Sequence, residues 1–108
     1  MLTLEEHIRL LKKGEYNASV IAAFRFLETT ISDKFNAAKT VPPLNTLSLL
    51  NTNNAKDKRT LQKVKDYRKV RNSIVHTNMT VSKKTAIDIT HSIDQLCQSI
   101  KTGDIIIL

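Results

Sequence analysis

One long amphipathic stripe limits the fold of this chain more than any other feature. Between Glu15 and Lys39, large apolar residues recur at three- and four-residue steps. The stripe consists of Val20, Phe24, Leu27, Ile31, Phe35 and Ala38. A helix with about 3.6 residues per turn brings such positions onto one face, whereas a strand would turn them alternately to opposite faces. The stripe therefore predicts a central helix with one side buried in a core.

Helical patterns and stop signals divide the rest of the chain into four more segments. These are a helix from the capping-box pattern at residues 3–6 to Gly14, a short helix at residues 44–50, a basic helix at about residues 57–75, and a last helix from Ser82 to Gly103. Pro42 and Pro43 stop the central helix, and the polar run at residues 51–54 predicts a loop. Ser82 is suited to cap the last helix, and Gly103 to end it.

Strand periodicity is confined to the apolar tail at residues 105–108. The chain has only two Gly and two Pro in 108 residues, which favours ordered helices over turns. We therefore predict an all-α, four- to five-helix up-down bundle that forms a single domain over residues 1–108. The tail is too apolar to be left in water, so we expect it to pack on the bundle or to cover a partner.

Cysteine use and the apolar runs bear on the compartment. Cys97 is the only cysteine, so the chain has no disulfide framework and no cysteine-based zinc site, as is usual in a reducing compartment. No apolar run approaches the roughly 20 residues that cross a bilayer. Glu5, Glu6 and Arg9 stand where a signal peptide would be apolar. These features predict a soluble, cytoplasmic protein with no membrane partner.

The positive charge is concentrated in one segment. The chain carries a formal net charge of +7, which favours an anionic partner such as RNA. Residues 56–71 contain eight basic residues and only two acidic ones, Asp57 and Asp66. From this segment we select Lys63, Lys65, Arg68 and Lys69 as candidate RNA-binding residues. The alternative for such a segment is a solvated helix face.

An arginine and a histidine five positions apart lie at the end of the basic segment. The planar guanidinium of Arg71 is well shaped to hold a phosphate, and His76 is the side chain that moves protons near pH 7. Together they supply a base for a 2′-hydroxyl and a cation for the charge that builds on phosphorus. This chemistry cleaves RNA without a metal ion, and we predict no cofactor. His7 and His91 lack neighbours at metal-ligand spacing, so no metal site is predicted.

Helical-wheel geometry restricts how the two side chains could cooperate. At about 100° per residue, Arg71 falls near the centre of the apolar arc of the basic helix. A charge in that position needs a carboxylate or a phosphate, and Glu28 is the candidate structural partner within the chain. On an unbroken helix, Arg71 and His76 diverge by roughly 140°. They can meet only if the helix ends near Val75, or if the Arg71 of one copy meets the His76 of another.

These residues resemble the HEPN family, small helical bundles found in higher eukaryotes and prokaryotes. Its ribonucleases carry an Arg, a polar residue and then a His, as in the segment from Arg71 and Asn72 to His76. Arg25, three residues before Glu28, is similar to the family's early-helix pattern. The resemblance implies a homodimer with one composite site and metal-independent cleavage that leaves a 2′,3′-cyclic phosphate. It implies that His76 is general base or acid, that Arg71 clamps the phosphate, and that Asn72 orients by hydrogen bonding. The residues alone leave open a second role for Asn72, as a cap of the helix end.

Two classes of function follow from these observations. The first is a toxin- or defence-type endoribonuclease that works as a homodimer and has an antitoxin or a larger multidomain protein as a further partner. The alternative is a non-catalytic HEPN-like module for dimerisation, protein interaction or RNA binding. The positions of Arg71 and His76 discriminate between them, since an Arg71–Glu28 pair sealed in the core would favour the alternative.

Overall fold

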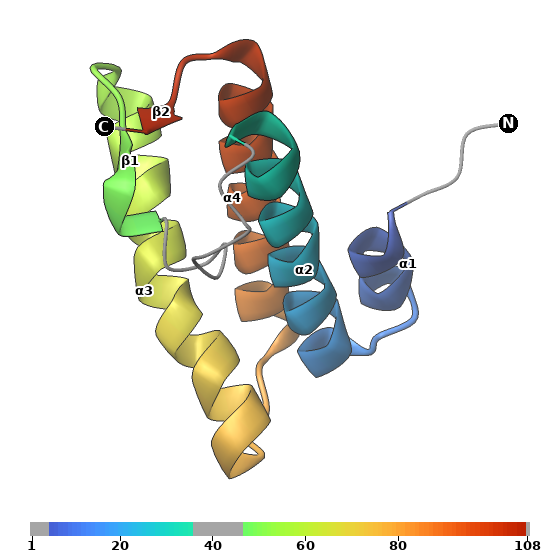
Figure 1. Ribbon diagram of the computed structural model, residues 1–108. Helices are drawn as coiled ribbons and strands as arrows, with labels where there is room; N and C mark the ends of the chain where they lie inside the picture. Colours follow the sequence, from blue (N-terminus) through green and yellow to red (C-terminus); the bar gives the residue numbers. More distant parts are fainter. Residues whose placement is uncertain (1–4, 36–46, 108) are drawn as a thin grey trace, which may run out of the picture.

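Four helices make up most of the residues that the computed structural model describes, which are 5–35 and 47–107 (Figure 1). They are α1 (Glu6–Lys12), α2 (Tyr16–Phe35), α3 (Ala55–Thr77) and α4 (Lys83–Thr102). A pair of two-residue strands, β1 (Leu50–Asn51) and β2 (Ile106–Ile107), lies at one end of the helices. The predicted all-α bundle is thus confirmed.

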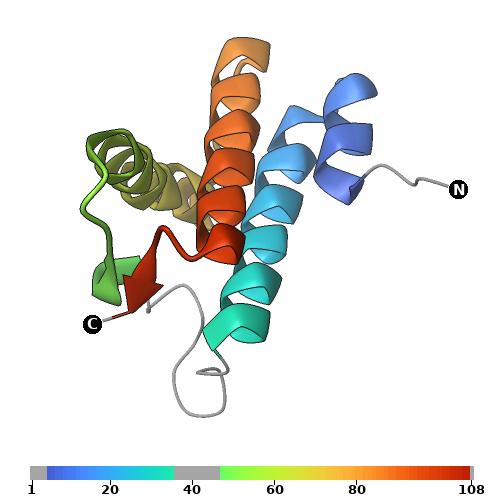
Figure 2. The same cartoon turned by 90° about the horizontal axis from the view of Figure 1, so that it is seen from above.

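The core lies between α2 and α4. Seen from above, these two helices run side by side in the middle, with α1 on the far side of α2 and α3 on the other side of α4 (Figure 2). Val20, Phe24 and Leu27 of the predicted central stripe are fully buried on α2. The last helix contributes the complementary apolar face, with Ile89, Ile93, Leu96 and Ile100 fully buried. The hydrophobic effect, through burial of these apolar side chains, is the main contribution to the stability of the bundle.

Side-chain and left-handed caps set the ends of the two C-terminal helices. The Asn54 side chain accepts hydrogen bonds from the backbone N–H groups of Lys56 and Asp57, at 2.9 and 3.2 Å. Ser82 accepts one from the backbone N–H of Thr85 at 3.2 Å, as predicted for a cap of α4. Gly103 ends α4 with a φ of 86°, a conformation that a residue without a Cβ adopts at little cost.

The first two helices agree with the prediction in part. α1 begins at Glu6, after an N-cap residue, Glu5, that makes no side-chain cap hydrogen bond. The predicted cap, Thr3, lies outside the described residues, as does the C-terminal part of the central helix beyond Phe35. His7 is almost completely buried and its Nε2 is hydrogen bonded to Asp94 Oδ1 at 2.8 Å. This bond joins α1 to α4.

The segment before α3 differs from the prediction. Where a short helix was expected at residues 44–50, the described part contains one 3₁₀ turn at residues 47–49 that leads directly into β1. β1 pairs antiparallel with β2, so that Leu50 lies opposite Ile107 and Asn51 opposite Ile106. Ile105 is fully buried against the bundle, which confirms the expected packing of the tail for that residue. The strand pair arises from a partner more than fifty residues away, which local sequence patterns do not reveal.

Hydropathy along the helices bears on membrane contact. In the ranges 5–35 and 47–107, no helix combines the length and the apolar character needed to span a bilayer.

Candidate functional site

α3 continues without a break through the predicted motif. Arg71, Asn72 and His76 all lie within α3, which ends at Thr77 and is followed by Asn78 in the left-handed conformation, with a φ of 55°. The helix therefore does not end near Val75, and Arg71 and His76 point in directions that differ by roughly 140°. One copy of the chain does not present both side chains to the same phosphate.

The Arg71 guanidinium is held by its neighbour in sequence. Its Nη1 donates a hydrogen bond to Asn72 Oδ1 at 3.0 Å, and its Nε is buried without a hydrogen-bond partner among the described residues. The expected ion pair with Glu28 is not present in the part of the chain that the structure describes, although both side chains are half-buried. Arg71 is thus not sealed against a carboxylate in the described part of its chain.

The position of Arg71 near the end of α3 explains this difference. Figure 1 shows the C-terminal turns of α3 running past the ends of α2 and α4. The wheel places Val75 within the same apolar arc as Arg71, yet Val75 is 48% exposed. Met79, just beyond the helix, is 40% exposed. Ile74, which shares this arc, is still buried, so only the Val75 edge of the arc is surface at the motif.

Asn72 and His76 lie together on the adjoining flank of α3. They are four residues apart, so their side chains are neighbours on the helix surface. Asn72 does not cap the helix, since Asn78 occupies the C-cap position. His76 is exposed, and its ring has no hydrogen-bond partner within residues 5–35 and 47–107. Asn72 therefore lies between the Arg71 guanidinium that it binds and the imidazole that shares its flank.

The basic segment divides into two flanks of α3. By the rotation of about 100° per residue, Lys58, Lys65 and Lys69 share the flank of Asn72 and His76. We call these three residues the lysine row. Lys56, Arg59 and Lys63 lie roughly 130° away, on a flank that we call the α4-side flank. Of the candidate RNA-binding residues, Lys65 and Lys69 thus lie on the side of His76, Lys63 does not, and Arg68 is half-buried at the edge of the core.

Lys63 ties α3 to α4. Its Nζ donates to Asp88 Oδ1 at 3.1 Å, while the Tyr67 hydroxyl donates to Asp88 Oδ2. Burial of the phenol, together with the hydrogen bond to Asp88 and its negative charge, raises the pKa of Tyr67 to about 12. The hydrogen bond from Tyr67, followed by the bond and the charge of Lys63, lowers the pKa of the Asp88 carboxyl against the effect of partial burial. The charge of Lys63 is therefore already matched.

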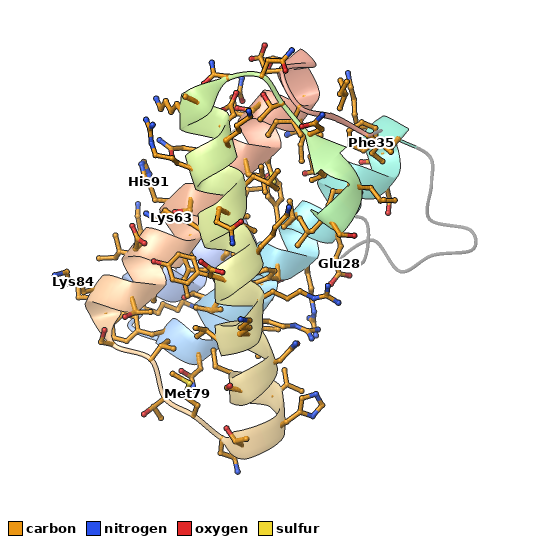
Figure 3. All side chains as sticks on the ribbon, turned by 90° about the vertical axis from the view of Figure 1, so that its left-hand side faces the viewer. Glu28, Phe35, Lys63, Met79, Lys84 and His91 are labelled. Carbon is orange, nitrogen blue, oxygen red and sulfur yellow. The ribbon has the colours of Figure 1, made fainter. Side chains whose placement is uncertain are left out.

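A hollow of about 540 Å³ lies beside this cluster. It is lined by Tyr67, Lys84, Thr85, Ile87, Asp88 and His91. Figure 3 shows Lys63, Lys84 and His91 on the same side of α3 and Glu28 on the opposite side. This cluster was not predicted from the sequence. Its only local signals are the four-residue spacings of Lys63 with Tyr67 and of Lys84 with Asp88, because the contacts join residues 21 or more positions apart.

The described residues contain neither a metal-ligand cluster nor a reactive cysteine. No group of three or more His, Cys, Asp or Glu side chains in residues 5–35 and 47–107 is placed to hold a metal ion. Cys97 is buried, and this burial raises the pKa of its thiol to about 11. A protonated, buried thiol is a packing group rather than a nucleophile.

Comparison with family models, with curated proteins and with solved structures finds no match to this chain. The HEPN resemblance therefore stays a prediction that depends on the residues of the motif and on the helical fold.

Proposed function

We propose that this chain is a metal-independent endoribonuclease of the HEPN type, with an active site shared between two copies. One observation carries the proposal. The unbroken α3 presents the Arg71–Asn72 pair and the exposed His76 on surfaces roughly 140° apart, so a phosphate can meet both groups only between two chains. Arg71 and His76 are the two chemical groups that cleavage without a metal requires.

The reaction assigns a separate task to each group. His76 of one copy takes the proton of an RNA 2′-hydroxyl, and the 2′-oxygen attacks the adjacent phosphorus. Arg71 of the other copy stabilises the negative charge on the phosphate oxygens, while Asn72 holds the guanidinium through the 3.0 Å hydrogen bond. His76 returns the proton to the leaving 5′-oxygen. The products are a 2′,3′-cyclic phosphate and a 5′-hydroxyl end.

Apolar exposure around the motif supports a homodimer. Val75 and Met79 are exposed apolar side chains next to the motif. A two-fold arrangement of the C-terminal turns of α3 would cover these groups and bring Arg71 of one copy to His76 of the other.

The cellular setting is a further part of the proposal. An unrestrained ribonuclease damages the RNA of the cell that makes it. We therefore propose a cytoplasmic toxin or defence role, in which an antitoxin or a larger multidomain partner restrains the activity.

A second candidate function is a non-catalytic helical module for dimerisation or RNA binding. It is favoured by the lack of any side chain that orients the His76 ring within the described part of the same chain. A general base is usually held in one orientation by a third group.

Cleavage of RNA in EDTA distinguishes the two functions. We expect the purified protein to cut single-stranded RNA without added metal, and His76→Ala to lower the rate by about a hundred- to ten-thousand-fold. His91→Ala is the matched control, because His91 is also an exposed histidine but lies on α4. Equal rates for the parent and His76→Ala, or a strict need for a divalent metal, would favour the non-catalytic module.

A further inference from the structure

The lysine row is straight and ends at His76. Lys58, Lys65, Lys69 and His76 follow one another at steps of seven, four and seven residues along α3. These steps are close to whole helical turns, so the four side chains stay within roughly 40° of one direction. At a rise of 1.5 Å per residue, they are spaced roughly 10, 6 and 10 Å apart along the helix axis.

The cations of the row are free to bind an external anion. Lys58 and Lys69 are exposed and Lys65 is half-buried, and none of the three makes an ion pair within residues 5–35 and 47–107. The two acids of α3 face other groups: Asp57 accepts a hydrogen bond from Ser99 at 2.8 Å, and Asp66 one from Gln62 at 3.1 Å. Within the described residues, the row therefore has no carboxylate in an ion pair with it.

The α4-side flank differs although it carries the same number of cations. Lys63 on that flank is paired with Asp88 at 3.1 Å. The flank also lies roughly 130° from the lysine row, so a strand bound there would not run toward His76. The two flanks together show that charge density alone does not mark the row. The row differs from the α4-side flank in two ways. None of its three lysines is in an ion pair within the described residues, and the row points along α3 to His76, the candidate general base.

We propose that the lysine row binds the phosphates of an extended single strand of RNA and directs the strand to His76. This proposal rests on the proposed function, because it gives that ribonuclease its substrate class. A straight row of cations can follow the backbone of an extended strand, whereas the phosphates of a duplex wind around its axis and leave the row after a short contact. Recognition of a duplex also needs contacts across its grooves, which a single row does not supply.

The composition of the row predicts little sequence preference. The lysine row and the positions between its members on the same flank contain no aromatic side chain on which a base could stack. Contacts to phosphates position a strand but do not read its bases. Binding should therefore be mainly electrostatic and should weaken steeply as salt is raised.

Two triple variants of equal charge test the row. One is Lys58→Gln with Lys65→Gln and Lys69→Gln, and the control is Lys56→Gln with Arg59→Gln and Lys63→Gln. The probe is a fluorescent 2′-O-methyl oligouridylate, which cannot be cleaved by attack of a 2′-hydroxyl. For single strands each phosphate contact contributes about 0.7 to the salt slope, so loss of the row should lower the slope by about two units. The control should keep a slope close to that of the parent.

The outcomes separate this proposal from the proposed function. Equal loss of slope in both triple variants, with both folded by circular dichroism, would overturn the row as the binding surface. Binding of a duplex of the same length with an equal dependence on the row would overturn the assignment to single strands. If the parent shows the row-dependent slope but cleaves no RNA, the lysine row is supported as the binding surface and the proposed ribonuclease function is contradicted. If the parent cleaves RNA and the row variant keeps the parent slope, the ribonuclease is supported and the lysine row is overturned as the binding surface.

Discussion

At the scale of single residues, the candidate site depends on what holds the Arg71 guanidinium. The Arg71 side chain is predicted to need a carboxylate or a phosphate, and Glu28, at the edge of the apolar stripe, is the best candidate within the chain. The structure shows instead that Asn72 accepts the hydrogen bond from Nη1 at 3.0 Å and that no ion pair with Glu28 forms in the described residues. The wheel gave the direction of Arg71 correctly, but it carries no information on where the neighbouring helices end.

Arg71→Lys tests the role of the guanidinium. We expect the rate of RNA cleavage to fall by about a hundred-fold, because an ammonium group is a point charge and cannot make two parallel hydrogen bonds to the phosphate. Fold and dimerisation should be kept, since the charge remains. Arg25→Lys on the exposed face of α2 serves as the control. A cleavage rate for Arg71→Lys equal to that of the control would show that Arg71 does not clamp the phosphate.

At the scale of the elements, local patterns predicted the helices and missed the contacts between them. The apolar stripe of α2 and the Ser82 and Gly103 ends of α4 were read from spacing and cap chemistry, which act within a few residues. The β1–β2 pair and the Tyr67–Asp88–Lys63 cluster join segments that are distant in the chain. Only the packing of the bundle brings them together.

Tyr67→Phe tests the tie between α3 and α4 through its pH dependence. Below pH 10.0, the ordinary pKa, the phenol is protonated in both the folded and the unfolded chain. Between pH 10.0 and about 12 only the unfolded chain ionises, so this residue makes the free energy of unfolding fall over that window. Tyr67→Phe should lose about 1 to 2 kcal/mol at neutral pH and should show a shallower fall in alkali.

Urea unfolding at neutral and alkaline pH measures both effects. Tyr16→Phe is the control, since it also removes one phenol but leaves the Asp88 cluster intact. A Tyr67→Phe protein that loses stability between pH 10 and 12 as steeply as the parent would contradict the assigned role of the phenol.

At the scale of the whole molecule, one copy of the chain supplies only part of the proposed active site. α3 extends past the ends of α2 and α4 (Figure 1). Val75, in its last turns, and Met79, just beyond it, are exposed. The sequence predicted the two ways in which Arg71 and His76 could meet, and the continuity of α3 to Thr77 excludes a meeting within one chain. The arrangement of two copies depends on surface complementarity, which the helical pattern of a sequence does not predict.

Charge placed on the extension should separate the copies. We expect Val75→Glu combined with Met79→Glu to sediment as a monomer and to lose RNA cleavage, because the like charges would meet across the proposed two-fold interface. Ile87→Glu and Leu49→Glu are the matched control, as both residues are exposed apolar side chains away from the motif. A variant that stays dimeric and active would place the interface elsewhere.

Complementation between two inactive variants tests the shared active site most directly. Arg71→Ala and His76→Ala are purified separately, checked by circular dichroism for folding and then mixed in equal amounts. A mixed dimer keeps one of its two Arg71–His76 pairs intact, with Arg71 from one chain and His76 from the other. Since about half of the dimers are mixed, the account predicts that the mixture regains about a quarter of the parent rate. Mixed dimers that form in solution and still cleave no RNA would contradict the account.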